Sequence, residues 1–169
     1  MAEQKGLPSD DLKSISDRII QLSQADHCRV NIDSGWRGYT RVATNRITSA
    51  GGADSTNVNI TSVFGKRVAS INTNSLDSSE LEAAVRQSEI MARLAPESPE
   101  YVPELGVQSY QPVQAYYDST GELDPLTRAE AAAIAIQQAQ ASDQIAASYM
   151  DVQAGTSTVA TSNGLYGSH

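Results

Sequence analysis

Segments with helical periodicity alternate along this chain with segments that have the two-residue alternation of strands, and that order restricts the fold most. The second helical segment begins with a capping box, Asp77 with Glu80. The third opens at Asp124-Pro125, since proline suits the first helical position. The helices predicted from this periodicity span residues 9–24, 77–95 and 125–141.

Between the helices, apolar and polar residues alternate as they do in half-buried strands. Turns are predicted at Ser34-Gly35, at Gly65 and at Ala154-Gly155. Because short turns join consecutive strands, the sheet should be mostly antiparallel. We therefore predict an α+β fold, a mostly antiparallel sheet with three helices packed on it. The predicted strands cover residues 29–34, 36–44, 57–64, 66–72, 144–153 and 156–161.

The tripeptide Val-Ala-Thr recurs at nearly the same distance from two predicted helix ends. It begins at Val42, eighteen residues after Gln24. It begins again at Val159, nineteen residues after Gln140. Chance recurrence is the alternative, because Ala, Ser and Thr are abundant here. We predict an internal duplication of a helix–strand–strand unit, with Val42 and Val159 on equivalent strands.

The chain, residues 1–169, is long enough for a single domain with a core of its own. We divide it into a first unit (9–95), an irregular crossover with Pro and Tyr (96–122) and an incomplete second unit (123–169). The second unit stops where its next hairpin would begin. Strand 156–161 should therefore present an unpaired edge, which either recruits another strand or leaves the residues after it frayed.

Two interpretations of this incomplete unit remain open. In one, Asn163-Gly164 is a closing turn before a natural terminus. In the other, the chain is the truncated product of a longer gene.

Charge is unevenly distributed. The chain has 12 Lys+Arg against 20 Asp+Glu, a net charge of −8, yet residues 29–67 carry +4. The negative balance argues against nucleic-acid binding, because phosphate contacts need clustered Lys and Arg. The basic residues either line the solvent face of strands or meet an acidic partner or a substrate carboxylate. The candidates for such a partner or substrate contact are Arg37, Arg41, Asn45, Arg46 and Arg67.

Targeting features are missing from the sequence. No run approaches the eighteen apolar residues of a membrane span, and no apolar segment follows the N-terminus as in a secretory signal. The one cysteine, Cys28, cannot form an internal disulfide, which suits a reducing compartment. We expect a cytoplasmic protein with neither a membrane nor a nucleic-acid partner.

No motif for catalysis or metal binding is present. A catalytic zinc needs about three protein ligands, and the chain offers only His27, Cys28 and His169 as nitrogen or sulfur ligands. Adjacent strand residues point to opposite faces, so His27 and Cys28 do not easily share one metal. The nucleophile elbow and the phosphate-binding glycine loop are also missing. The residues alone indicate a scaffold domain with no catalytic residue, no metal ligand and no cofactor.

Several stretches, in this order, resemble the N-terminal part of the TldD/PmbA family, whose older label is modulator of DNA gyrase. They are an Ala-x-Asn-x-Ile strand, a hairpin with a Gly turn, a Leu-Asp-led helix with an Ala-x-x-x-Pro-like stop, and a Ser-Asn-Gly strand end. The similarity covers most of residues 10–165. The matching stretches are 41–48, 57–72, 76–96 and 162–164.

The resemblance implies a zinc-dependent, cytoplasmic peptidase system that degrades unfolded peptides or trims small modified peptides. Its members form homodimers, or heterodimers of two paralogues. The family's metal helix, His-Glu-x-x-x-His, would follow residue 169, and half of the paralogues lack it. No zinc ligand of the family matches a residue here. Zinc is therefore expected for the full-length family enzyme, and this chain should be inactive alone.

Two functions follow as alternatives. In the first, the chain is the N-terminal domain of a metallopeptidase (hydrolase) subunit, and it helps to form the dimer and enclose the substrate chamber in cytoplasmic proteolysis. In the second, it is a non-catalytic interaction or scaffold module. A His-Glu-x-x-x-His motif downstream in the gene would favour the first.

Overall fold

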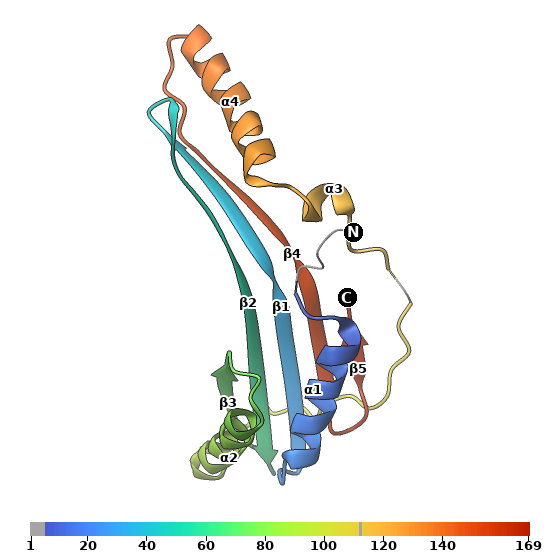
Figure 1. The fold of residues 1–169 in the computed structure, drawn as a ribbon. Coiled ribbons are helices and arrows are strands. Elements are labelled where there is room, and N and C mark those ends of the chain that lie inside the picture. The colour runs from blue at the N-terminus through green and yellow to red at the C-terminus, as the bar shows by residue number, and fades with distance from the viewer. Residues whose placement is uncertain (1–5, 112) are drawn as a thin grey trace. The chain divides into compact units, whose positions relative to one another are not determined.

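Within residues 6–111 and 113–169, which the computed structural model describes, five strands form one sheet in the order β3-β2-β1-β4-β5 (Figure 1). The α+β class is confirmed, and a short helix, α3, is added within the predicted crossover. The strands are β1 (His27–Ala43), β2 (Arg46–Phe64), β3 (Arg67–Thr73), β4 (Ser148–Thr161) and β5 (Tyr166–Ser168). The helices are α1 (Ser9–Leu22), α2 (Ser78–Leu94), α3 (Asp118–Gly121) and α4 (Pro125–Ala141).

The sheet is antiparallel, as the short turns predict. Strands β2 and β3 pair with Ile60 opposite Ile71, and β4 and β5 pair with Val159 opposite Gly167. The predicted turn at Gly65 is confirmed. Its φ of 61° lies in the left-handed region, which glycine adopts without the steric cost of a side chain.

The hairpin between β1 and β2 is tighter, and β2 is longer, than the sequence indicates. Two residues, Thr44 and Asn45, form the turn with φ angles of 50° and 57°. Such a pair of positive φ values matches the twist of the flanking strands. Strand β2 then begins at Arg46 and includes residues 49–56, which no strand prediction covers because they lack a regular apolar alternation.

The turns predicted at Ser34-Gly35 and Ala154-Gly155 are wrong, because β1 and β4 each continue through these residues. A Cβ atom added to Gly35 would lie 2.6 Å from the carbonyl oxygen of Ala154 and 2.8 Å from Cα of Gly155. The glycine therefore allows two backbones to approach closely within the sheet, which is a second common reason for glycine in a strand.

The predicted open edge at residues 156–161 is also wrong. Strand β4 lies between β1 and β5 in the sheet. The chain reverses at Asn163-Gly164, where Gly164 has a φ of 87°, and returns as β5. The pairing extends to His169, whose N–H donates to the Ser157 carbonyl at 3.1 Å and whose carbonyl accepts from the Ser157 N–H at 2.9 Å.

The chain forms two compact units that share strands β1, β2 and β4. Unit 1 includes Gly35–Asp54 and Gln114–Gly155. Unit 2 consists of Leu7–Ser34, Ser55–Val113 and Thr156–His169. Each unit is built from segments that are far apart in the sequence. The division predicted from the sequence, into 9–95, 96–122 and 123–169, instead follows chain order and describes a different property, so it stays a prediction.

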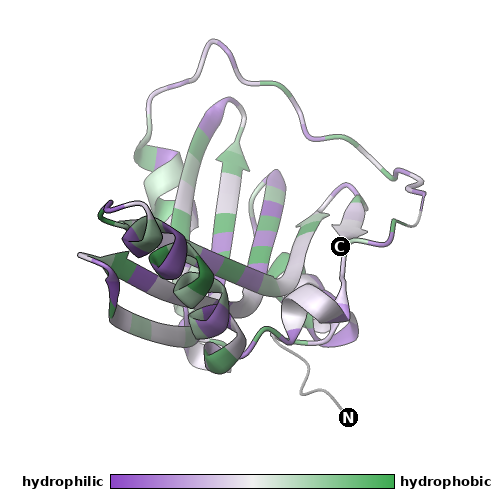
Figure 2. Ribbon diagram, turned by 90° about the horizontal axis from the view of Figure 1, so that it is seen from above, coloured by the Kyte–Doolittle hydropathy of each residue, from purple (hydrophilic) through white to green (hydrophobic). Residues whose placement is uncertain are grey.

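Unit 2 holds the main hydrophobic core. Helices α1 and α2 cover one face of the strands, and apolar and polar residues alternate along those strands (Figure 2). Burying one Leu, Ile or Val side chain contributes about 1.5–3 kcal/mol, so this cluster dominates the stability of the unit. Its members are Leu12, Ile19, Cys28, Val30, Ile32, Val58, Ile60, Leu81, Ala84 and Val85.

Unit 1 has a smaller apolar interior. Its buried apolar side chains are Val42, Ala132 and Val152 among the described residues. Helix α4 begins at an N-cap, Asp124, whose carboxylate accepts from the Thr127 N–H at 2.6 Å. None of the helices in the described part of the chain is long and apolar enough to span a membrane.

Candidate functional site

The five side chains predicted to contact a partner do not form one cluster. Arg37, Arg41, Asn45 and Arg46 belong to the β1–β2 hairpin of unit 1, whereas Arg67 lies on β3 in unit 2. Each must therefore be judged by its own contacts.

Asn45 has a structural role. Its Nδ2 donates to the carbonyl oxygen of Gln144 at 3.0 Å, and its Oδ1 accepts from the N–H of Ala146 at 2.6 Å. The side chain thus connects the β1–β2 turn to the segment between α4 and β4. The amide oxygen and one amide N–H of Asn45 are thus engaged within unit 1, and a contact of Asn45 with a partner or substrate stays a prediction.

Arg37 and Arg67 are also engaged. Nε of Arg37 donates to Oδ1 of Asp151 at 2.7 Å. The hydrogen bond from Arg37 lowers the pKa of Asp151, and the same contact raises the pKa of Arg37. Nη1 of Arg67 donates to the carbonyl oxygen of Ala95 at 2.7 Å, just after α2 ends. A cation there favours the helix terminus, so Arg67 has a structural explanation too.

Arg41 and Arg46 remain available. Both are exposed, and neither side chain has a hydrogen-bond or ion-pair partner among the residues that the structure describes. Tyr39, two residues before Arg41 and therefore on the same strand face, stacks on Tyr149 with ring centroids 5.8 Å apart. Two exposed guanidinium groups on one hairpin, with an aromatic stack on the strand face of Arg41, form a surface that suits an acidic partner.

An ion pair in α2 between buried Glu89 and half-buried Arg86 was missed in the sequence. Oε1 of Glu89 accepts from the N–H of Gln24 at 2.5 Å and from the Ser23 hydroxyl at 3.3 Å. Its Oε2 accepts from Arg86 at 2.8 Å, and Arg86 also donates to the carbonyl oxygen of Leu22 at 2.7 Å. The pair therefore caps the C-terminal end of α1. The i, i+3 spacing of Arg86 and Glu89 is the one signal that could have revealed it.

The potential metal ligands identified in the sequence do not form a zinc site. Nδ1 of His27 lies 3.1 Å from Oδ1 of Asn163, which occupies that ring nitrogen. Burial raises the pKa of Cys28 to about 11, so the thiol stays protonated and is a poor ligand or nucleophile. No group of three or more His, Cys, Asp and Glu side chains that could hold a metal occurs within residues 6–111 and 113–169.

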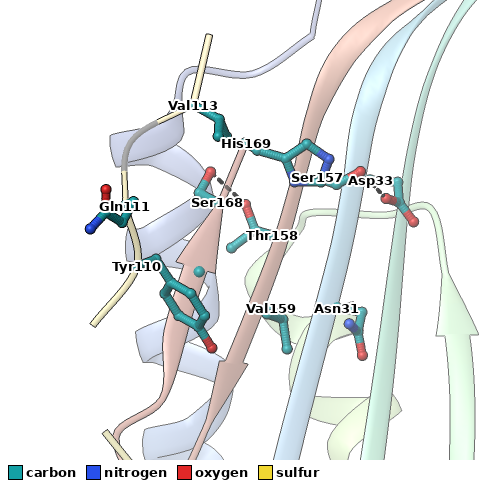
Figure 3. A pocket seen from close by; sticks show the side chains of 11 residues that line it. Asn31, Asp33, Tyr110, Gln111, Val113, Ser157, Thr158, Val159, Ser168 and His169 are labelled. Carbon is teal, nitrogen blue, oxygen red and sulfur yellow. Dashed lines mark hydrogen bonds between the residues drawn. The ribbon is translucent and has the colours of Figure 1, made fainter. Parts of the chain in front are cut away.

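A pocket of about 510 Å³ lies in unit 2, on the sheet face that points away from the core (Figure 3). Its position follows from the strand alternation, since Asn31 and Asp33 line it while Val30 and Ile32 are buried on the opposite face. Strands β1, β4 and β5 and the crossover together line it. The lining residues are Asn31, Asp33, Tyr110, Gln111, Val113, Ser157, Thr158, Val159, Gly167, Ser168 and His169.

The fold, and not the sequence, relates this chain to known proteins. No family model matches the sequence, and no curated protein matches it. Solved structures do match: the fold is that of a domain of TldD/PmbA-type proteins, which confirms the resemblance inferred from the sequence at the level of the fold.

Three of these structures cover nearly all of the chain. TldE from Thermococcus kodakarensis has a TM-score of 0.80 at 17% identity, over 94% of this chain and 36% of that one. A protein from Thermotoga maritima described as a candidate modulator of a DNA gyrase has a TM-score of 0.75 at 15% identity, over 94% and 37%. A candidate modulator of DNA gyrase from Bacteroides thetaiotaomicron has a TM-score of 0.84 at 17% identity, over 96% and 39%. The chain thus spans little more than a third of the length of these proteins.

Proposed function

We propose that this chain acts as the N-terminal domain of a TldD/PmbA-type metallopeptidase subunit in cytoplasmic proteolysis. The supporting observation is the likeness of its fold to TldE and to the modulator proteins, over at least 94% of its residues. In this role it contributes to a dimer, with a second copy or with a paralogous subunit, and to the chamber that encloses a peptide substrate.

The surface of unit 1 supports a role in association. Helix α4 has two charged residues in seventeen, Arg128 and Glu130, and Arg128 is buried. Its outer face exposes Leu126 and Ile134, which are 66% and 64% accessible. Exposed apolar helix surface of this kind is typical of protein–protein contacts.

Zinc does not fit the described residues of this chain, and no catalytic step is assigned to them. No three His, Cys, Asp or Glu side chains among residues 6–111 and 113–169 lie close enough to share a metal, and Cys28 is a buried, protonated thiol. We propose that the metal expected for the full-length family enzyme is held by a paralogous subunit or by sequence outside residues 1–169. The chain by itself should therefore not hydrolyse peptides.

The test is to mix the purified chain with a TldD-type subunit that carries His-Glu-x-x-x-His. We expect a complex in analytical ultracentrifugation and a change in the cleavage rate of an unfolded peptide. A chain that stays monomeric, forms no complex and leaves the rate unchanged would contradict the proposal.

A substitution in α4 tests the proposed surface. Ile134→Glu should weaken association about tenfold or more, because it buries an unpaired charge in the contact. Ile90→Glu is the matched control, since Ile90 is a 51% accessible isoleucine on α2 of unit 2. Equal effects of the two substitutions would show that α4 is not the contact.

An interaction module without a peptidase role is the second candidate. It is favoured by the exposed side chains of Arg41 and Arg46, of which Arg41 lies on the same strand face as Tyr39 of the Tyr39–Tyr149 stack. If it is correct, replacing both arginines with alanine should reduce binding of an acidic peptide. Lys66→Ala is the control, because Lys66 is also exposed but lies on the turn between β2 and β3 in unit 2.

A further inference from the structure

The pocket in unit 2 carries an inference that is independent of the proposed function. We propose that it binds a small organic cation, an ammonium or guanidinium group attached to an apolar body. Its volume of about 510 Å³ lies within the range of small-molecule sites, roughly 300–1,000 Å³.

Asp33 supplies the negative charge. Its Oδ1 accepts from the Ser157 hydroxyl at 2.6 Å, which fixes the orientation of the carboxylate. Its Oδ2 has no hydrogen-bond partner among the described residues, so it is free to accept from a ligand. With histidine counted as neutral, Asp33 carries the one formal charge among the side chains that line the pocket in the described part of the chain.

The other end of the pocket is apolar and aromatic. Tyr110 and Val159 line it, and Figure 3 shows Tyr110 well apart from Asp33, whereas Val113 lies beside His169. The Tyr110 ring packs close to Gly167, since a Cβ atom added there would lie 3.4 Å from Cε2 of the ring. A ligand with its cation at Asp33 can therefore place an apolar body against Tyr110 and Val159.

Charge decides the ligand class. No Lys or Arg side chain is among the described residues that line the pocket, so an anion would meet Asp33 without a balancing cation. A neutral ligand would gain hydrogen bonds to Asn31 and Gln111 but not the stronger, charge-assisted bond to the carboxylate. The lining therefore selects cation over neutral molecule and neutral molecule over anion.

The experiment uses three probes of one shape: phenethylamine, phenethyl alcohol and phenylacetate. Binding to the chain is followed at pH 8 by amide chemical shifts in NMR, in particular those of Ser157 and Gly167. We expect saturable binding of the amine, about tenfold tighter than that of the alcohol, and weaker binding still of phenylacetate. Equal affinity for amine and alcohol, or tighter binding of phenylacetate, would overturn the proposal.

Asp33→Asn removes the charge and keeps the shape, and Ser157 can still donate to the new amide oxygen. It should weaken amine binding about tenfold and leave alcohol binding unchanged. Glu100→Gln is the control, since it removes an equal charge from an exposed residue outside the pocket. If Asp33→Asn does not fold, Tyr110→Ala replaces it, because Tyr110 is 59% accessible. Tyr110→Ala should bind the amine more weakly, whereas Tyr110→Phe should bind it as tightly as the parent chain does. If the parent chain binds no phenethylamine at concentrations up to about 10 mM, the proposal is wrong.

Discussion

At the residue scale, two buried ionisable side chains in unit 2 show how the local surroundings determine what a side chain contributes to the fold. Glu89 is 1% accessible, and each of its carboxylate oxygens accepts hydrogen bonds. Cys28 is also 1% accessible, but it lies in the apolar cluster beside Val30, and burial favours its neutral thiol. The carboxylate thus stabilises the fold through its partners, whereas the thiol behaves as a small apolar side chain.

Removing the charge of Glu89 should destabilise the protein. In Glu89→Gln the amide oxygen can still accept from Gln24, but the amide nitrogen and Arg86 are both donors. We expect a loss of about 1–3 kcal/mol in the free energy of unfolding, measured by urea denaturation. Glu82→Gln, on the exposed side of the same helix, should change it by less than about 0.5 kcal/mol. Equal effects at the two positions would contradict the capping role.

The Cys28 thiol predicts a pH dependence of stability at alkaline pH. Its pKa is raised from 9.0 in the unfolded chain to about 11 by burial, so the folded state binds the proton more tightly. This contribution is present below about pH 9 and is lost as the pH rises through 11. The difference in unfolding free energy between parent and Cys28→Ala should therefore shrink between pH 9 and pH 11. A difference that is constant over this range would refute the prediction.

At the element scale, strands β1 and β4 continue through Gly35 and Gly155, where the sequence predicts turns. Within unit 1, Gly35 on β1 approaches Ala154 and Gly155 on β4 so closely that a side chain would collide with backbone atoms. Backbone cannot move aside as a flexible side chain can. A methyl group at Gly35 must therefore push the strands apart and weaken their pairing.

Gly35→Ala should lower the free energy of unfolding by about 1–3 kcal/mol, measured by thermal or urea denaturation. Gly106→Ala provides the control. A Cβ atom there lies 3.9 Å from its nearest neighbour, the carbonyl oxygen of Asn163, which is ordinary van der Waals contact. If Gly35→Ala is as stable as the control, the close approach of β1 and β4 does not require glycine at position 35.

At the scale of the whole molecule, the topology has the order that an internal duplication requires. Helix α1 is followed by β1 and β2, and α4 is followed by β4 and β5. Strands β1 and β4 are neighbours in the sheet. They run antiparallel, since Asp33 bonds to Ser157 while Cys28 bonds to Ser162. Each Val-Ala-Thr tripeptide stands where the first strand of its hairpin ends.

The duplication itself stays a prediction, and a superposition of the two proposed units would test it. Residues 9–45 should superpose on residues 125–163 with Val42 and Val159 on matching strands. A superposition that pairs the helices but places the two valines on different strands would rule it out, and the tripeptide would then be a chance recurrence.

The sequence by itself determined the elements whose signals are local. The predicted helices agree with α1, α2 and α4 to within two residues at each end, because apolar spacing acts over one or two turns. The capping box predicted at Asp77 is wrong, since the Asp77 side chain makes no cap hydrogen bond, whereas Asp124 does cap α4. The turn at Gly65 and the buried alternation of Val30 with Ile32 were equally readable. These features depend on neighbours a few positions away.

Only the tertiary structure decided the roles of glycines and polar side chains whose partners are distant in the sequence. Asn45 bonds to a residue 101 positions away, and Arg37 to one 114 positions away, so a pattern of exposed polar residues could not separate them from Arg41. From neighbouring residues alone, a glycine in a turn cannot be told from one such as Gly35, which lies within a strand where two backbones approach closely. The pocket likewise combines β1, β4, β5 and the crossover, and its chemistry exists only because folding brings Asp33 next to Ser157.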